Sequence, residues 1–289
     1  MKECILYSKK KSGKIRCSAC SHRCLISNGR VGLCGVRKNI DGKLYLMVYG
    51  KVISMHVDPI EKKPLYHFLP NTKSFSIGTI GCNFFCGFCQ NYEISQEREI
   101  RGFNINPKEI VEEAIKTGCK SISYTYNEPT IFAEFVKDTA EIAKQKGLKN
   151  VLVTNGYMTK ECLDFLSKPI KLIDAMNIDL KSFNEKFYIK TCKAYLKPVL
   201  ETIKYSHKLG IHIEITTLII PGINGNDSIK ELEKIAKFIA SIDKNIPWHI
   251  SRFFPTYKMT DRRATDLEIL RKAEEIGKRH LKNVYIGNV

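Results

Sequence analysis

The stretch Gly81-Cys82-Asn83-Phe84-Phe85-Cys86-Gly87-Phe88-Cys89-Gln90 follows directly on an alternating run at residues 74–80 that is typical of a β-strand. Its cysteines are spaced CxxxCxxC, so three thiols fall close together on one loop. Three thiolates can bind one cubane iron-sulfur cluster and leave one of its irons without a cysteine ligand. Zinc prefers four ligands in paired groups, which this spacing does not offer, and three unligated core thiols are the other alternative. We therefore expect a 4Fe-4S cluster with one open iron, bound by Cys82, Cys86 and Cys89.

The composition is typical of an intracellular enzyme. The chain has 289 residues, which is long enough for one large domain or for a domain with an appendage. Its 11 cysteines are clustered, and clustered spacings favour metal ligation in a reducing compartment over disulfides. The sequence shows no signal peptide, and no apolar run approaches the ~20 residues that a membrane-spanning helix needs. We expect a cytoplasmic protein without a membrane partner.

The formal net charge of +17 allows two interpretations. The field of a basic protein attracts nucleic acids or acidic proteins. Lysine-rich, solvated helix faces of the kind seen in thermophilic proteins give the same charge without any such partner. No basic motif interleaved with aromatic residues accompanies the charge, so nucleic acid is not the expected partner.

A regular alternation of strands and helices follows the cysteine loop. Three capping boxes predict helix starts, namely Asn106 with Glu109, Ser228 with Glu231 and Thr265 with Glu268. The expected strands lie at 74–80, 121–126, 150–154, 175–180, 211–220, 248–253 and 283–286. Six βα units and a last strand are too few for a closed eight-stranded barrel. The predicted fold is therefore α/β, a partial open (β/α)6 TIM-like barrel over residues 71–289, with functional residues at the carboxyl ends of its strands.

The first ~70 residues precede this rhythm and have cysteines of their own. We expect residues 1–70 to form a small cysteine-rich, metal-binding unit. Four thiols close in sequence make a complete ligand set for zinc or for a second iron-sulfur cluster, and unligated thiols are the alternative. This second set is Cys17, Cys20, Cys24 and Cys34. The remaining cysteines are expected to be buried apolar residues, namely Cys4, Cys119, Cys162 and Cys192.

Polar residues follow several of the expected strands. Asp179 and Lys181 are two residues apart on a strand, so they point to the same face and can reach one ligand, although a surface ion pair is the alternative. His249 and Arg252 share a face only if their strand bulges, and a lone strand histidine is more often a core residue.

The cysteine loop resembles that of the radical SAM superfamily, whose members bind S-adenosylmethionine at the open iron and cleave it reductively. This resemblance implies that Phe88 packs beside the adenine and that the turn Asn127-Glu128-Pro129 binds the amino group of the cofactor. The Asp-Leu-Lys segment is similar to one that contacts the cofactor in glycyl-radical activating enzymes. The expected cofactor contacts are Phe88, Asn127, Glu128, Pro129, Asn155, Asp179, Lys181, Thr216, His249 and Arg252.

The order of the segments along the chain resembles the radical SAM member of the AmmeMemoRadiSam system, which is similar to pyruvate formate-lyase activating enzymes. The resemblance implies an oxidoreductase that takes electrons from a ferredoxin or flavodoxin and starts radical chemistry on an unidentified substrate, with a glycyl-radical-type protein as one candidate. Thr216 stands where those activases have an arginine for the methionine carboxylate, and Arg252 or Lys181 could replace it. No residue is assigned a catalytic role.

Two other functions remain open from the sequence. One is a metal-binding redox or interaction module that does not cleave S-adenosylmethionine. The other is a radical SAM enzyme that modifies nucleic acid, which only the positive charge supports.

Overall fold

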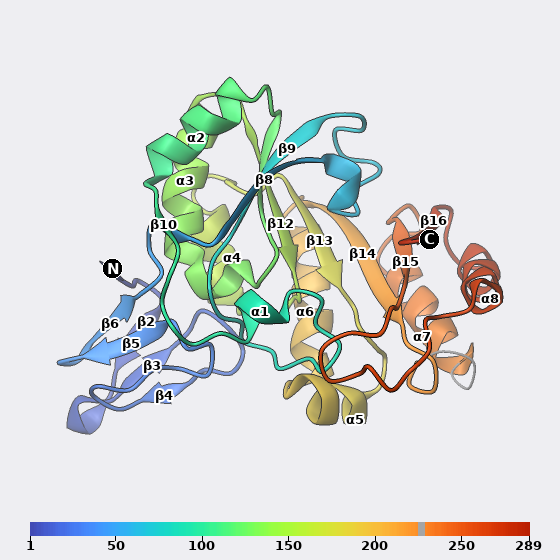
Figure 1. The fold of residues 1–289 in the computed structure, drawn as a ribbon, viewed down its shortest axis with the longest axis horizontal. Coiled ribbons are helices and arrows are strands. Elements are labelled where there is room, and N and C mark those ends of the chain that lie inside the picture. The colour runs from blue at the N-terminus through green and yellow to red at the C-terminus, as the bar shows by residue number, and fades with distance from the viewer. Residues whose placement is uncertain (225–228) are drawn as a thin grey trace.

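The chain folds around one large, mostly parallel sheet (Figure 1). The computed structural model describes residues 1–224 and 229–289. Within these residues, eight strands lie in the order β16-β15-β14-β13-β12-β11-β9-β8, and β8 alone runs antiparallel to its neighbour. The strands are β8 (Ser54–Pro59), β9 (Lys73–Gly78), β11 (Ser121–Tyr124), β12 (Lys149–Thr154), β13 (Ala175–Asp179), β14 (His212–Ile219), β15 (Trp248–Arg252) and β16 (Val284–Gly287). The expected open α/β barrel is confirmed, with β8 as an additional edge strand.

Helices cover the outer face of this sheet. They are α2 (Pro107–Lys116), α3 (Ala133–Gln145), α4 (Lys160–Ser167), α6 (Leu196–Lys208), α7 (Ile229–Ala240) and α8 (Leu267–Lys278). Short helical turns lie elsewhere in the chain, namely α1 (Tyr92–Ser95), α5 (Glu185–Phe187), η2 (Ile60–Lys62), η3 (Pro129–Phe132) and η4 (Tyr188–Cys192). The capping box of Asn106 with Glu109 is confirmed at the start of α2. Ser228, in the second expected box, lies outside the described residues.

The third expected capping box is wrong. Asp266, not Thr265, precedes α8. The Thr265 hydroxyl instead donates to the Ile219 carbonyl at 2.5 Å and accepts from the Phe253 amide at 3.0 Å. Thr265 therefore connects the ends of two neighbouring strands and is not available to cap a helix.

The two faces of the sheet differ in polarity. In the parallel pairing, Asn177 lies opposite Glu214 and Thr216 lies opposite His249, so these side chains share the inner face. Alternate positions hold buried isoleucines, which pack under the outer helices, such as Ile178, Ile215 and Ile250. The sheet therefore encloses a polar lumen, while its hydrophobic core lies on the outer side.

A segment after β8 closes the amino-terminal end of the lumen. Ile60 and Leu65 pack there against Val151 and Ala175. The amides of Tyr66 and His67 donate to the Glu214 carboxylate at 3.0 and 2.8 Å. We call residues 60–68 the floor segment. It belongs to the expected unit 1–70, whose division from the barrel at residue 70 stays a prediction.

Small antiparallel sheets make up the rest of the first 70 residues. They contain β1 (Lys2–Glu3), β2 (Tyr7–Lys9), η1 (Lys11–Gly13), β3 (Ile15–Cys17), β4 (Leu25–Ile26), β5 (Arg37–Ile40) and β6 (Lys43–Leu46), while β7 (Lys51–Val52) pairs with β10 (Phe103–Asn104). These strands lie beside α3 and α4 (Figure 1). The buried Arg37 guanidinium joins them to the barrel, because it donates to Glu134 at 3.1 Å and to the Ile131 carbonyl at 2.9 Å. No helix of the described residues is long and apolar enough to cross a membrane.

The Glu214 carboxylate generates a prediction about pH. Burial opposes its charge, but hydrogen bonds from His212, His249 and two backbone amides outweigh burial and lower the pKa of Glu214 to about 2. A carboxylate with a lowered folded-state pKa stabilises the fold above its ordinary pKa of 4.5 and loses this contribution as the pH falls toward 2. Such a shift corresponds to about 3 kcal/mol at neutral pH.

We expect Glu214→Gln to lower the free energy of unfolding in urea at pH 7 and to differ much less from the unsubstituted protein at pH 3. Glu141→Gln, at a solvated position on α3, is the control and should change little at either pH. A Glu214→Gln effect of the same size at both pH values would contradict this account.

Candidate active site

The cysteine loop joins β9 to α1 and has no regular secondary structure between residues 79 and 91. Its peptide groups are satisfied by other parts of the chain. The Phe85 amide donates to the Cys192 carbonyl at 3.1 Å, and the Gly87 carbonyl accepts from the Lys258 amide at 2.9 Å. The conformation of the loop is therefore set by the elements around it.

The three thiols of this loop have hydrogen-bond donors close by. The Phe84 amide donates to Cys82 Sγ at 3.4 Å, and Cys89 Sγ lies 3.1 Å from the Ser95 hydroxyl. Cys86 is buried, whereas Cys82 and Cys89 are partly exposed. Among the described residues, no three His, Cys, Asp or Glu side chains form a group arranged to hold a single metal ion. This finding covers the thiols of the loop and those of the second cysteine set alike.

Glu128 is fully enclosed at the carboxyl ends of β11 and β12. Its carboxylate accepts hydrogen bonds from the Thr130 amide at 3.1 Å, the Thr154 hydroxyl at 2.7 Å and the Asn155 amide at 2.7 Å. Burial raises the pKa of Glu128, and these hydrogen bonds counter part of that rise. Because its oxygens are occupied, Glu128 positions the turn at Asn155 in this arrangement. Pro129 follows it and is buried at the start of η3.

Two asparagines attach the strand ends to the cysteine loop. Asn127 Nδ2 donates to the Thr79 hydroxyl at 2.9 Å and to the Gly81 carbonyl at 2.8 Å. Asn155 Nδ2 donates to Asn83 Oδ1 at 2.8 Å. Both expected cofactor contacts thus lie directly at the loop, where they determine its position.

Asp179 and Lys181 lie at the carboxyl end of β13. Lys181 Nζ is 2.7 Å from Asp179 Oδ2 and 5.7 Å from the centre of the Phe88 ring. Thr216 lies opposite Asp179 in the sheet. Asn177 lies two residues before Asp179 on the same strand and donates to the Thr216 hydroxyl at 2.9 Å. The Asn177 Oδ1 is buried without a partner among the described residues. An unpaired buried acceptor in the lumen favours a polar ligand there.

His249 and Arg252 are not brought together. β15 pairs in regular register with β14 and β16, so the bulge that would align the two side chains does not occur. His249 Nε2 lies 2.7 Å from the Glu214 carboxylate, at the level of the floor segment. Arg252 Nε donates to the Thr265 carbonyl at 2.8 Å on the other face of the strand. As cofactor contacts, both residues remain predictions. Residues nearer the cysteine loop are better placed to contact a cofactor bound there.

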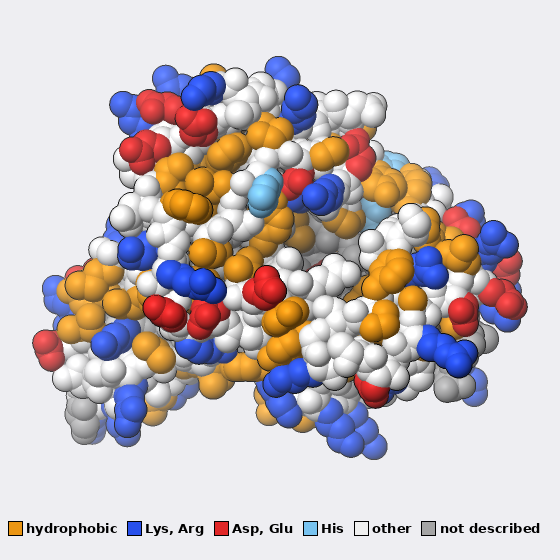
Figure 2. All heavy atoms as spheres, in the orientation of Figure 1, with side chains coloured by type: hydrophobic (Ala, Val, Ile, Leu, Met, Phe, Trp, Pro, Cys, Tyr) orange, Lys and Arg blue, Asp and Glu red, His pale blue; other side chains and the backbone are white. Residues whose placement is uncertain are grey.

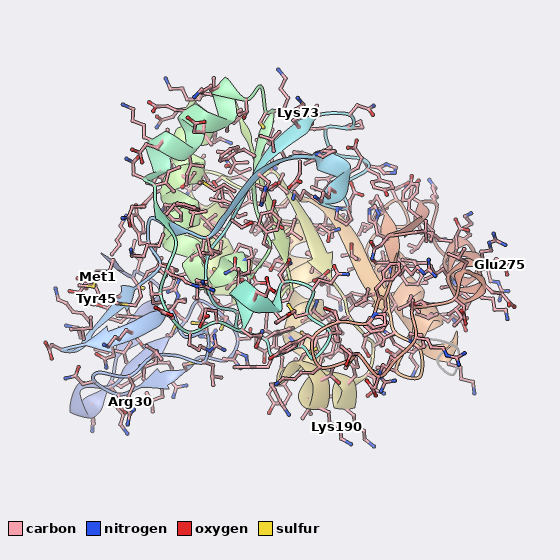
Figure 3. All side chains as sticks on the ribbon, in the orientation of Figure 1. Met1, Arg30, Tyr45, Lys73, Lys190 and Glu275 are labelled. Carbon is pink, nitrogen blue, oxygen red and sulfur yellow. The ribbon has the colours of Figure 1, made fainter. Side chains whose placement is uncertain are left out.

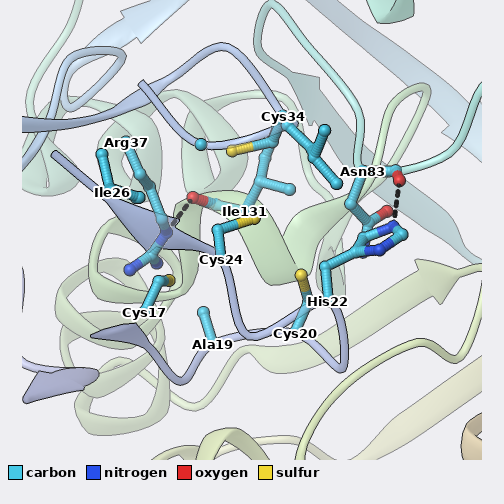
Figure 4. A pocket seen from close by; sticks show the side chains of 12 residues that line it. Cys17, Ala19, Cys20, His22, Cys24, Ile26, Cys34, Arg37, Asn83 and Ile131 are labelled. Atoms are coloured by element: carbon cyan, nitrogen blue, oxygen red, sulfur yellow. Dashed lines mark hydrogen bonds between the residues drawn. The ribbon is translucent and has the colours of Figure 1, made fainter. Parts of the chain in front are cut away.

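The second cysteine set lies directly beside the loop. The four thiols line one cavity of about 10 Å³, which Asn83 of the loop also lines (Figure 4). His22 Nε2 is 2.8 Å from the Asn83 carbonyl. A Cβ at Gly81 would come within 2.5 Å of the Cys34 carbonyl, so glycine is required for this close approach. Neither contact has a signal in the sequence, because each joins distant segments.

Cys192, which the sequence predicts to be a buried apolar residue, lies next to the cysteine loop. It is fully buried, as are Cys4, Cys119 and Cys162. Its thiol lies beside the Cys86 thiol of the loop; this neighbour lowers the pKa of Cys86, while burial and Cys86 raise the pKa of Cys192. No spacing rule predicts this contact, which arises only when η4 packs against the loop.

A cleft of about 430 Å³ opens beside the loop, which is within the usual size range of small-ligand sites. Figure 2 shows the molecule hollowed on this side. Tyr126 stands in the cleft with a φ of +67° and donates its hydroxyl to Asp58 at 2.7 Å. Asp58 also pairs with the buried Lys63 at 2.7 Å. The other lining residues are Ser54, His56, Val57, Lys62, Gln90, Asn91, Glu93 and Ile94.

Comparison with known proteins gives three consistent similarities. A family model described as the radical SAM superfamily matches residues 76–239. An uncharacterized protein of Methanocaldococcus jannaschii is 48% identical over 100% of this chain and 86% of its own length. A second protein of that organism, which bears the name of a glycyl-radical enzyme activating enzyme, is 31% identical over 71% of this chain and 77% of its own length.

Solved structures support the fold. A domain of the pyruvate-formate lyase-activating enzyme from Bacteroides vulgatus superimposes with a TM-score of 0.51 at 19% identity, covering 58% of this chain and 99% of that chain. Streptococcus suis SuiB bound to S-adenosylmethionine superimposes with a TM-score of 0.58 at 19% identity, covering 75% and 52%. At this identity, the likeness concerns the fold alone.

We expect Glu128→Gln to destabilise the protein by about 1–3 kcal/mol, because the amide group would place a donor against donors in a buried site. Urea unfolding measures this loss. Glu112→Gln, on the exposed side of α2, is the matched control and should have little effect. Equal stability of the Glu128 and Glu112 variants would contradict a positioning role for Glu128.

Proposed function

Because the chain belongs to the radical SAM superfamily, we propose that it binds a 4Fe-4S cluster through Cys82, Cys86 and Cys89 and cleaves S-adenosylmethionine reductively. The observation that carries the proposal is the three-thiol loop, around which polar side chains from three strand ends converge. The bound cluster supplies an electron to a carbon-sulfur bond of S-adenosylmethionine. The protein supplies the positions of the reacting groups.

The surroundings of the thiols suit such a cluster. The Phe84 amide and the Ser95 hydroxyl are near Cys82 and Cys89, and donors of this kind stabilise sulfur ligands and tune the cluster potential. Three loop cysteines leave one iron open for the cofactor. The unpaired Oδ1 of Asn177 gives the adjoining lumen an acceptor for a polar ligand.

The methionine carboxylate needs a cation, which Thr216 cannot provide. Lys181 is the better of the two expected replacements. Its ammonium group lies beside the loop and near Phe88, whereas Arg252 is bound to Thr265 on the other face of β15. In this proposal Asp179 orients Lys181, and Asn127, Glu128 and Asn155 fix the loop.

A polypeptide is the proposed class of substrate. A relative bears the name of a glycyl-radical enzyme activating enzyme, and SuiB has been solved bound to its precursor peptide. The order of the segments supports assignment to the AmmeMemoRadiSam type, and an oxidoreductase of this kind would act in the cytoplasm with a ferredoxin or flavodoxin as reductant. The four N-terminal thiols remain a proposed site for zinc or a second iron-sulfur cluster.

The proposal is tested by reconstituting the protein anaerobically with iron and sulfide, reducing it with dithionite and adding S-adenosylmethionine. We expect mass spectrometry to detect 5′-deoxyadenosine and methionine. Methylthioadenosine would instead reveal cleavage of another carbon-sulfur bond, and an iron-loaded protein that forms no product would refute the proposed reaction.

Single cysteine variants test the two-site division. We expect Cys86→Ala to lose the cluster of the loop and all cleavage, and Cys20→Ala to keep both. Iron content and the electron paramagnetic resonance signal of the reduced cluster measure the outcome. Cys119→Ala, a buried cysteine of neither set, is the control. If Cys20→Ala also abolished the signal, the two cysteine sets would not be independent.

A further inference from the structure

We propose that residues 185–197 form the docking surface for an acidic, one-electron-donating protein, whose electron reaches the cluster at Cys86 through Cys192. We call these residues the docking segment. The inference rests on the proposed function, because it presupposes a cluster bound by Cys86. It adds a route and a place for the reductant.

Cys192 contacts the cysteine loop through its backbone, and its side chain lies beside that of Cys86. Its carbonyl accepts from the Phe85 amide at 3.1 Å, and its thiol lies beside the Cys86 thiol. The aromatic rings of Tyr188 and Phe84 pack edge to face at 6.3 Å beside this contact. The segment is therefore hydrogen-bonded to the cysteine loop one residue away from a proposed cluster ligand.

The buried Cys192 thiol lies immediately under the protein surface. Lys193 follows Cys192, adopts a left-handed φ of +58° and is exposed. The change from a fully buried cysteine to an exposed lysine occurs at one peptide bond. A protein bound over Lys193 would thus be separated from the cysteine loop by Cys192 and its neighbours alone.

The docking segment combines apolar and positively charged side chains at its surface. Ile189 and Tyr195 are 45% and 56% exposed, so the docking segment presents apolar side chains to solvent. Four exposed lysines accompany them, namely Lys186, Lys190, Lys193 and Lys197. Figure 2 shows Lys and Arg side chains gathered at the lower edge of the molecule, where Figure 1 places α5 and Figure 3 labels Lys190. Apolar residues beside a charged rim are typical of a protein interface.

The charge of the docking segment indicates an acidic partner. Its one acidic residue, Glu185, accepts from the Leu196 amide at 2.9 Å, and Glu201, just beyond the segment, lies 3.8 Å from Lys197. The remaining field is positive and attracts an acidic protein, accelerating its association. In the transfer the partner loses one electron and the cluster gains one, and no bond forms or breaks. The positive field would also attract nucleic acid, but nucleic acid would not donate an electron to a cluster at Cys86.

The test uses the full-length, cluster-loaded protein and a reduced flavodoxin as the probe. Lys190→Glu/Lys193→Glu is compared with Lys108→Glu/Lys116→Glu on α2, which makes the same change in net charge at two positions that are each 76% exposed. We expect the second-order rate constant of cluster reduction at low ionic strength to fall at least about tenfold in the first variant. The α2 variant should stay close to the unsubstituted protein.

Two controls distinguish a loss of docking from a damaged cluster site. Photoreduced deazaflavin, a small neutral reductant, should reduce the cluster of both variants at the same rate. Added salt should lower the flavodoxin rate of the unsubstituted protein toward that of the docking-segment variant. An equal fall in both charge variants would overturn the proposal, because the effect would then come from total charge. Loss of oligonucleotide binding together with an unchanged flavodoxin rate would also overturn it.

Cys192→Ala tests the route. We expect it to retain full iron content and flavodoxin affinity while its cluster is reduced more slowly by flavodoxin, with Cys119→Ala unchanged. Loss of iron would instead identify Cys192 as a cluster ligand and overturn the route, as would an unchanged rate. An unsubstituted protein that binds iron without the signal of a reduced 4Fe-4S cluster would refute the proposed function itself, before any variant is compared.

Discussion

The cysteine loop must satisfy its peptide groups without a helix or strand of its own, and this constraint organises the site. Buried peptide groups left unpaired would cost free energy, so distant segments supply the partners. Asn127 comes from a strand end, His22 from the N-terminal residues, Cys192 from η4, and Lys258 from the segment after β15. Residues that look like ligand contacts in the sequence therefore also act as the framework of the loop. The same side chains link cofactor position to fold stability.

The sheet separates two kinds of interior. Its outer face is covered by helices over buried isoleucines, while its inner face carries Asn177, Glu214 and His249. Polar groups are tolerated there because most of them pair with each other or with the floor segment, as Glu214 does with the amides of Tyr66 and His67. This arrangement allows a polar ligand to enter the barrel without disturbing the apolar core. Stability and chemistry are thus divided between the two faces of one sheet.

The sequence predicted what depends on local pattern. Residue alternation, the strand and helix rhythm and a β-branched run at 211–220 located the seven parallel strands, and Asn106 with Glu109 located α2. Edge strand β8 was missed because its polar alternation and terminal proline weaken the strand signal. Thr265 was misassigned because a capping motif cannot be distinguished from a threonine that bonds two strands. The contacts of Cys192 with Cys86 and of His22 with Asn83 depend on tertiary packing, which no spacing encodes.

The floor segment closes the amino-terminal end of the lumen. Because Ile60 and Leu65 fill this end, a molecule cannot cross the barrel from one end to the other. Two ligands bound one behind the other in the lumen would therefore occupy unequal positions, and the one nearer the floor segment would have to bind first. Steady-state kinetics would register this arrangement as an order of binding.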